Sequence, residues 1–343
     1  MAIVSIADPD VEVGVEGGVL VLRRQGQLLR RLVEREVEEL HLTGPVELTA
    51  GARHLLLRRG IDTVFLTMDG RVRGRLVASE GNQGDRRLLQ YAAIQDAPHR
   101  LSVARAVVAG KLTNQRMLLL QRQRTLRVEA VADALAGLRA SVGQLGAAKD
   151  LDSLRGREGD AAARYFGTFP ALLRNPAFTW PGRNRRPPKD PVNACLSYGY
   201  TLLVVRVAHA VRSAGLDPYL GVLHEAGRGK EALALDLAEI FRPMVDGIVL
   251  TLINRGQLGP EDFGPPDVDL MADEPELNQE GAVYLNKLGR TLLLRAWSQR
   301  LADRSPHPTT DDDWSIAGLI RTQAHALRRA LLERTPFVAA EVC

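Results

Sequence analysis

The pattern of hydrophobic and polar residues changes once along the chain, from the alternation typical of strands to the longer period of helices. Within residues 11–77, VEVGV alternates, VLVL follows the pair Gly17–Gly18, and IDTVFL and RVRGRLV flank turn residues 68–70. These runs predict half-buried strands joined by tight turns. One helix is predicted among them, at residues 50–59, because Gly60 directly after it is a good C-cap.

The polar stretch SEGNQGD at residues 79–85 has no periodicity and is typical of a linker. Helical periodicity follows it, and Asp190 with Pro191 makes an N-cap and first turn for a strongly apolar helix. We predict helices at residues 85–96, 98–124, a segment that contains Glu158 and ends near Asn175–Pro176, 191–215, 231–243, 280–302 and 313–334. The predicted fold class is α+β, with a small N-terminal β-rich domain (residues 1–78), a short linker (79–87) and a larger all-α domain (88–343).

Composition agrees with about two folded domains. The chain has 343 residues, 45% of them hydrophobic, which supports a sizeable core and excludes a disordered or fibrous protein. Two cysteines, Cys195 and Cys343, allow no disulfide framework and no cysteine-based zinc site within one chain, which favours a reducing cytoplasm. Because the sequence has no signal-peptide pattern and no run of about 18 uncharged apolar residues, we expect a soluble cytoplasmic protein without a membrane partner.

Charge is distributed unevenly, although the net charge of the chain is only +4. Residues 86–190 hold 19 Lys and Arg against 8 Asp and Glu, a net of +11, whereas residues 244–343 hold 10 against 15. This asymmetry predicts a cationic face that binds phosphate, with the acidic C-terminal part facing away. The alternative is a solvated, arginine-rich surface.

The long helix predicted at residues 98–124 contributes to this basic region. At about 100° per residue, Arg100, Lys111, Gln115 and Arg122 fall on one side of the helix and form a polar, basic stripe. An irregular loop with the sequence TWPGRNRRPPKDP lies further along, and its prolines prevent regular backbone hydrogen bonding.

The chain lacks the short motifs of P-loop proteins, Rossmann folds, hydrolases with a nucleophile elbow and zincins: GxxxxGK[ST], GxGxxG, GxSxG and HExxH do not occur. The remaining candidates for functional residues are carboxylates in otherwise apolar segments. Asp236 and Glu239 are three residues apart on one helix face and repel each other, so either Arg242 or a metal ion is expected to neutralise them. The alternative is a solvated acidic face paired with Arg242.

Two further residues are candidates for the same site. His224 precedes Glu239 by 15 residues, and a loop followed by about two helical turns could bring the two side chains together. The alternative for His224 is a hydrogen-bonded turn residue. Glu158 lies between Gly156 and Gly159, which would allow the close approach of another backbone or a nucleic acid strand. Its alternative is a position in a frayed first turn, facing the helix N-terminus.

Four segments together resemble a known family: YAAIQDAPHRLSVARAVVAGKLTNQRMLLL, LRGREGDAAARYF, RNRRPPKDPVNACLSYGY and GLDPYLGVLHEAGRGKEALALDLAEIFRP. The chain resembles the CRISPR-associated adaptation endonucleases and integrases, the first of the two universal spacer-acquisition proteins. The motifs occur in the order of the family, and the resemblance covers nearly the whole chain.

The resemblance implies a divalent metal site that holds Mn²⁺ or Mg²⁺ through Glu158, His224 and Glu239, with Asp236 as a further ligand or a support. Two carboxylates and an imidazole without a thiolate suit these ions better than structural zinc. The resemblance also implies DNA contacts from Lys111, Arg164, Tyr165, Arg183, Arg185, Arg186, Asn193, Tyr200 and Arg242. The tyrosines have a second interpretation, as core residues with satisfied hydroxyl groups.

The function that the resemblance implies is insertion of short duplex DNA into a CRISPR array, by attack of a 3′-hydroxyl on a phosphodiester. The implied partners are double-stranded DNA (prespacer and CRISPR repeat), a second copy of the chain joined through the N-terminal domains, and the small second universal adaptation protein. Three rivals stay open: a metal-dependent nuclease of branched or single-stranded DNA, a non-catalytic DNA-binding scaffold, and a helical small-molecule enzyme.

Overall fold

The computed structural model describes residues 2–8, 10–67, 70–78, 84–126, 129–184, 187–227, 229–265, 280–306 and 312–342. The first part of the chain forms two sheets, whose strands are β1 (Ala2–Ile6), β2 (Val11–Glu16), β3 (Val19–Arg24), β4 (Gln27–Leu32), β5 (Val37–Thr43), β6 (Glu47–Leu48), β7 (Asp62–Leu66) and β8 (Val72–Leu76). One sheet has the order β1-β5-β7-β8 and the other β4-β3-β2-β6. The β-rich N-terminal region is therefore confirmed.

Strand pairing in this region follows the predicted turns. The strands β2 and β3 form a hairpin around Gly17 and Gly18, and β7 pairs antiparallel with β8. Helix α1 (Ala50–Arg59) begins after the N-cap Thr49 and ends at Gly60, whose φ of 65° is left-handed. The helix at residues 50–59 is thus confirmed with its C-cap.

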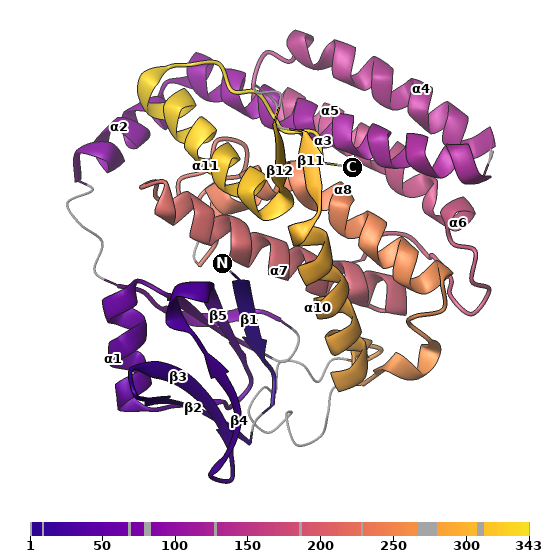
Figure 1. The fold of residues 1–343 in the computed structure, drawn as a ribbon. Helices are drawn as coiled ribbons and strands as arrows, with labels where there is room; N and C mark the ends of the chain where they lie inside the picture. The colour runs from indigo at the N-terminus through magenta and orange to yellow at the C-terminus, as the bar shows by residue number, and fades with distance from the viewer. Residues whose placement is uncertain are drawn as a thin grey trace.

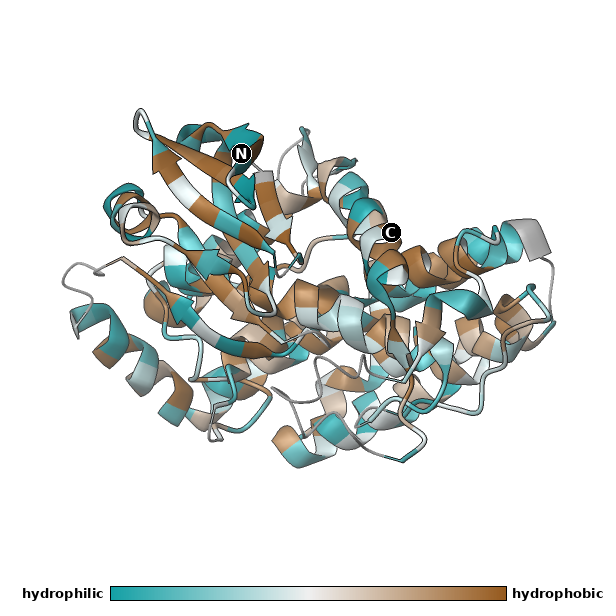
Figure 2. Ribbon diagram, turned by 90° about the horizontal axis from the view of Figure 1, so that it is seen from below, coloured by the Kyte–Doolittle hydropathy of each residue, from teal (hydrophilic) through white to brown (hydrophobic). Residues whose placement is uncertain are grey.

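The remaining chain is mostly helical. Its helices are α2 (Gly84–Gln95), α3 (Ala97–Leu126), α4 (Glu129–Gln144), α5 (Leu151–Gly167), α6 (Phe169–Leu172), α7 (Pro191–Ser213), α8 (Ala232–Asn254), α10 (Lys287–Ala302) and α11 (Ile316–Glu333). Figure 1 shows the N-terminal strands and α1 at one end of the molecule and the remaining helices at the other, with α7 and α8 in the middle of the helical part. These two helices pack against each other, and α3 packs against α8. In Figure 2 the peripheral α2 carries alternating teal and brown bands, as expected for an amphipathic helix.

Two short strand pairs and three 3₁₀ turns complete the described chain: β9 (Phe263–Gly264) with β10 (Tyr284–Leu285), β11 (Arg304–Pro306) with β12 (Asp313–Ser315), and turns at Glu34–Glu36, Leu145–Ala147 and Pro260–Asp262. The large hydrophobic core belongs to the helices, and a second, separate core lies among the strands and α1. The β-rich region ends with β8 at Leu76, and α2 already contains residues 84–87 of the predicted linker.

Helix boundaries differ from the prediction in several places. The helices predicted at 280–302 and 313–334 begin only at Lys287 and Ile316, because short strands occupy the start of both ranges. The helix that contains Glu158 ends at Gly167 rather than near Asn175, and α4 was not predicted. The helix predicted to end at Pro243 continues to Asn254. The proline removes one helical hydrogen bond, but the following turns bury Val249 and Ile253 in the core, and this burial outweighs the loss.

Among the residues that the structure describes, one helix, α7, is long and apolar enough to cross a membrane by length and composition alone. Its apolar window is 78% buried inside the protein, and its N-terminus is capped by Asp190 with Pro191 in the first turn, as predicted. The helix is therefore accounted for as the central core helix of the helical region.

A cluster of buried charges joins the strands to α7 and α8. We call it the junction cluster, and it consists of Glu38, Glu39, Asp62, Arg75, Arg206, His209, Arg212 and Glu231. Arg206 Nη2 lies 3.1 Å from Glu38 Oε1, and Arg206 Nη1 lies 3.4 Å from Glu39 Oε1. Arg75 and Arg212 both contact Glu231, the N-cap residue of α8. The sheet is thereby tied to the first turn of that helix.

Candidate functional site

Three helices bring two of the predicted acids together around one lysine. Lys111 lies in the middle of α3, Glu158 in the middle of α5 and Glu239 in the second turn of α8. Lys111 Nζ lies 2.7 Å from Glu239 Oε2 and donates a hydrogen bond to Glu158. Because Glu158 is in the helix interior, the alternative of a frayed first turn is wrong. Lys111, Glu158, His224, Asp236, Glu239 and Arg242 are called the carboxylate centre below.

Glu239 is almost completely buried and carries a full negative charge. Burial raises its pKa, but Arg242 and Lys111 outweigh that effect and lower the pKa to about 2. Arg242 Nη2 lies 3.1 Å from Glu239 Oε1, as expected for the cation that neutralises the acidic pair. The other oxygen, Oε2, is buried and has no hydrogen bond of acceptable geometry, although Lys111 Nζ is close to it. Oε2 of Glu239 is thus held by an ion pair with Lys111 and not by a well-aligned hydrogen bond, so it can still bind a cation that approaches along a better direction.

Asp236, the second acid of the pair, holds the loop that carries His224. Its carboxylate accepts hydrogen bonds from the backbone N–H groups of Val222, Leu223 and His224 at 2.6, 3.0 and 2.9 Å. His224 Nδ1 lies 2.6 Å from Asp236 Oδ1, so this nitrogen donates and Nε2 is left as the one that can bind a cation. Gly221 permits this packing, since a Cβ there would lie 2.6 Å from the backbone oxygen of His224.

His224 lies near the two glutamates without completing a metal site. It is close enough to contribute to the lowered pKa of Glu239, and its side chain is 30% exposed. Within the described ranges, no group of three or more His, Cys, Asp or Glu side chains is arranged to hold a metal ion. The donor set of Glu158, Glu239 and the free His224 Nε2 suits Mn²⁺ or Mg²⁺ chemically, and Lys111 lies between the two carboxylates.

Prediction from sequence missed Asp246, which lies in the same helix as Glu239. Its carboxylate accepts hydrogen bonds from Tyr165 Oη at 2.7 Å and from Tyr200 Oη at 2.5 Å. Burial raises the pKa of Asp246 to about 6, although both tyrosines act in the opposite direction. The prediction ended this helix at Pro243 and so left Asp246 outside it; an acid in the continuing apolar run ALALDLAEIFRPMVDGIVL is the signal that was available.

Several predicted DNA contacts are occupied by internal interactions. Tyr165 and Tyr200 are buried with their hydroxyl groups bonded to Asp246, as in their second interpretation. Asn193 is also buried, and its oxygen accepts a hydrogen bond from Arg183 Nη1 at 2.6 Å. The guanidinium groups of Arg183 and Arg242 lie over the Tyr200 ring, 5.4 and 4.8 Å from its centroid. Tyr165, Tyr200 and Asn193 therefore have a structural role in this conformation.

The remaining DNA-contact predictions have different outcomes. Arg164 is exposed and lies along α4 at Gly137. Arg185 and Arg186 lie outside the described residues. Gly156 and Gly159, which flank Glu158, have no atom of the described chain within 4 Å of an added Cβ. Both glycines are exposed, so the surface of α5 beside them is open, while Glu158 itself is partly buried against Lys111.

The polar stripe on α3 faces the interior rather than solvent. Arg100 Nε donates to the backbone oxygen of Val222 at 2.9 Å, and Arg122 donates to the backbone oxygen of Gly247 at 3.0 Å. Lys111 and Gln115 are buried. In this conformation Arg100 binds the loop before α8, Arg122 binds α8, and Lys111 binds α5 and α8. The DNA contact of Lys111 stays a prediction.

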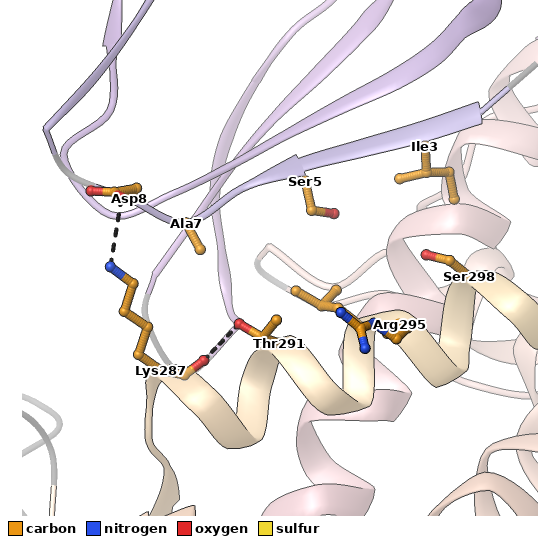
Figure 3. A pocket seen from close by; sticks show the side chains of 9 residues that line it. Ile3, Ser5, Ala7, Asp8, Lys287, Thr291, Arg295 and Ser298 are labelled. Carbon is orange, nitrogen blue, oxygen red and sulfur yellow. Dashed lines mark hydrogen bonds and ion pairs between the residues drawn. The ribbon is translucent and has the colours of Figure 1, made fainter. Parts of the chain in front are cut away.

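A cavity of about 360 Å³ lies elsewhere, between β1 and α10. Figure 3 shows Ser5 and Asp8 on one side of it and Lys287 and Arg295 on the other, with Lys287 paired to Asp8. None of the carboxylate centre lines this cavity. The cavity is therefore separate from the carboxylate centre.

The fold and the motifs place the chain in one family. It belongs to the CRISPR-associated protein Cas1 family, whose model matches residues 4–299, and the resemblance inferred from the sequence is confirmed. The CRISPR-associated endonuclease Cas1 1 of Thermus thermophilus is 39% identical over 324 residues, which cover 93% of this chain and 94% of that protein. A CRISPR-associated exonuclease Cas4/endonuclease Cas1 fusion of Rhodospirillum rubrum is 38% identical over 335 residues, 94% of this chain, and the chain spans only 54% of it.

Solved structures share the fold at low sequence identity. A Cas1 protein from Thermotoga maritima superposes with a TM-score of 0.80 and 24% identity, covering 99% of this chain and 100% of that chain. A casposase bound to its integration product superposes with a TM-score of 0.79 and 21% identity, covering 98% and 92% of the two chains. The α+β architecture, with strands first and helices after, is that of these proteins.

Proposed function

We propose that this protein is a metal-dependent DNA endonuclease and integrase of CRISPR adaptation, which inserts short duplex DNA into a CRISPR array. The observation that carries the proposal is the pairing of Glu158 and Glu239 around one cation, beside a histidine oriented by Asp236, in a chain of the Cas1 family. The names of its relatives, endonucleases in several bacteria, and its structural likeness to an integrating casposase support the same reaction class.

The metal would be Mn²⁺ or Mg²⁺, held by Glu158, Glu239 and the free nitrogen of His224. Such an ion polarises a phosphate and offsets the charge that develops when one oxygen displaces another. Asp236 acts as a support rather than a ligand, because three backbone N–H groups and the imidazole already use its oxygens. Its task is to keep His224 in one tautomer and one orientation.

Cations of the chain supply the rest of the electrostatics. Arg242 keeps Glu239 ionised, and its guanidinium is held in place by the ring of Tyr200. The open space beside Gly156 and Gly159 leaves room for a DNA strand to reach Glu158. Because one phosphodiester replaces another during insertion, no nucleotide cofactor and no covalent protein intermediate are needed.

The proposed partners are double-stranded DNA, as prespacer and as CRISPR repeat, a second copy of this chain, and the small second universal adaptation protein. Solved complexes named as Cas1 with Cas2 share this fold, which supports the last of these. The β-rich region is the proposed dimer contact. A cytoplasmic location follows from the proposed substrate, the chromosomal array.

The test is a joining assay with supercoiled plasmid and a short labelled duplex that has free 3′-hydroxyls, in the presence of Mn²⁺. We expect label to become covalently joined to nicked plasmid, with and without the small partner protein as separate arms. A duplex with 3′-dideoxy ends is the matched control and should give no joined product. If nicking occurs equally with both duplexes and nothing is joined, water is the attacking group and the protein is a nuclease without integration.

A further inference from the structure

Lys111 occupies the place between two carboxylates that a divalent ion would take. It is only 7% exposed, and its ammonium group is paired with Glu158 and with Glu239. Burial lowers its pKa, but the two glutamates outweigh burial and raise it, so Lys111 is a permanent cation. A buried lysine that pairs with two candidate metal ligands acts as an internal counter-ion.

The backbone of Lys111 is fixed by its neighbours on α3. A Cβ added to Gly110 would lie 2.3 Å from the Cβ of Ala339, so the segment after α11 presses directly on this helix. Asn114 Nδ2 donates to the backbone oxygens of Ile240 and Ala340, both at 2.9 Å. α3 is thereby locked to α8 and to that segment on both sides of Lys111. Only the four-carbon side chain of Lys111 is left to move.

The lysine fits its site incompletely. Its ammonium group is shared by two carboxylates, one of which also pairs with Arg242, and Glu239 Oε2 lacks a well-formed hydrogen bond to it. Arginine would fix such a pair in a rigid fork, whereas lysine is a point charge on a flexible stem. A divalent ion would pair with both carboxylates and would also bind Glu239 Oε2, the oxygen without a well-formed hydrogen bond.

We propose that Lys111 is an exchangeable cation, which holds the two glutamates together in the metal-free protein and leaves them when Mn²⁺ or Mg²⁺ binds. The inference rests on the proposed metal site. After exchange, the ammonium group of Lys111 is free to pair with a phosphate of the DNA. The protein thus avoids uncompensated buried carboxylates before the metal arrives.

Calorimetric titration of Mn²⁺ into three proteins tests the exchange: the unaltered chain, Lys111→Met and Arg122→Met. Lys111→Met removes the competing charge and keeps the apolar stem, so we expect Mn²⁺ affinity to rise about tenfold or more. Arg122 is on the same helix and donates to Gly247 and Thr251 of α8, and within the described part of the chain it has no carboxylate partner. Arg122→Met should lower the melting temperature and leave Mn²⁺ affinity unchanged.

Equal or weaker Mn²⁺ binding by Lys111→Met than by the unaltered chain overturns the exchange and leaves the metal site standing. Absence of Mn²⁺ binding by all three proteins overturns the metal site itself. Because Lys111→Met could fail to fold, a second measurement uses the unaltered protein. Brief acetylation followed by mass spectrometry should label Lys111 at least about fivefold faster when Mn²⁺ saturates the site, with the exposed Lys149 as reference. An unchanged rate contradicts the exchange.

Discussion

The junction cluster and the carboxylate centre are both built on the central helices, and they differ in which buried polar atoms lack a hydrogen bond. In the junction cluster the buried atoms without hydrogen bonds are donors: Arg75 Nη1, Arg206 Nε and Arg212 Nη1. In the carboxylate centre they include an acceptor, Glu239 Oε2. An unmet carboxylate oxygen attracts a cation, whereas surplus N–H groups repel one. This contrast separates a cluster that joins parts of the fold from the proposed metal site.

The two clusters also differ in the solvent exposure of their side chains. Glu39 and Arg206 of the junction cluster are sealed between the sheet and α7, with exposures of 0 and 2%. In the carboxylate centre the side chains of Glu158 and His224 are 18 and 30% exposed. The most exposed side chains of the junction cluster, Glu38 and His209, reach only 15 and 14%, so His224 is the most open group of the two clusters. Substitutions should therefore lower stability in one cluster and activity in the other.

Glu158→Gln is expected to give the largest effect. The variant loses a metal ligand, and DNA nicking and joining in Mn²⁺ should fall at least about 1,000-fold, which corresponds to about 4 kcal/mol of activation free energy. Its free energy of unfolding should change by less than about 1 kcal/mol, because Lys111 keeps Glu239 as a partner. Asp160→Asn, an exposed acid on the same helix, is the control and should retain activity. A stable Glu158→Gln protein with normal activity would remove Glu158 from the metal site.

Arg206→Met tests the junction cluster. The change leaves the fully buried Glu39 without its arginine, and we expect a loss of about 4 kcal/mol in the free energy of unfolding, measured in urea. Arg59→Met is the control, because Arg59 forms an exposed pair with Glu34 at 3.1 Å and should cost less than about 1 kcal/mol. If the two variants lose the same small amount, the junction cluster contributes nothing specific to folding.

Local signals in the sequence were sufficient for much of the fold. Gly60 and the Asp190–Pro191 pair correctly marked helix ends, because their effect depends on the backbone of their own turn. Pro243 misled the prediction for the opposite reason. Whether a helix continues through a proline depends on the burial of the residues beyond it, and Val249 and Ile253 are buried by distant parts of the chain.

The candidate site could be predicted in its acids, its histidine and the local pair of Arg242 with Glu239, but not in its long-range pairings. Glu158, His224, Asp236 and Glu239 lie in recognisable motifs, whereas the contact of Lys111 with Glu158 joins residues 47 positions apart. The stripe containing Lys111 was expected to face DNA. Periodicity places residues on one face of a helix, but it does not say whether that face meets solvent or the polar groups of another helix.

Asp236→Asn distinguishes a support from a direct metal ligand. Asparagine can still accept backbone hydrogen bonds but no longer fixes the proton on His224 Nδ1, so Mn²⁺ affinity should fall about 10- to 100-fold. Asp217→Asn is the control, since Asp217 accepts a bond from the Tyr219 N–H at 2.8 Å near the same loop. A loss as severe as that of Glu158→Gln would mean that Asp236 binds the metal itself, and an unchanged affinity would mean that its contacts serve only the fold of the loop.

His209 offers the smallest and most selective change, a pH dependence confined to the junction cluster. Burial lowers the pKa of His209, but Asp62 and Glu39 outweigh burial and raise it above its ordinary value of 6.5. His209 Nδ1 lies 3.0 Å from Asp62 Oδ2, and Glu38 and Arg206 are the other charged groups that face the ring. A raised pKa means that protonation stabilises the folded state, fully below about pH 6.5 and less as the pH rises through the folded pKa.

The test compares the unaltered chain with His209→Gln in urea denaturation from about pH 5.5 to 9. At the acidic end the variant should be less stable by about 1.5 kcal/mol, the size of a hydrogen bond to a charged group, and the difference should shrink as the pH rises. Glu158→Gln is the reference, because its neighbour Lys111 stays protonated throughout this range and its difference from the unaltered chain should be flat. A flat difference for His209→Gln as well would show a neutral imidazole, and His209 would then add no charge to the three arginines of the junction cluster.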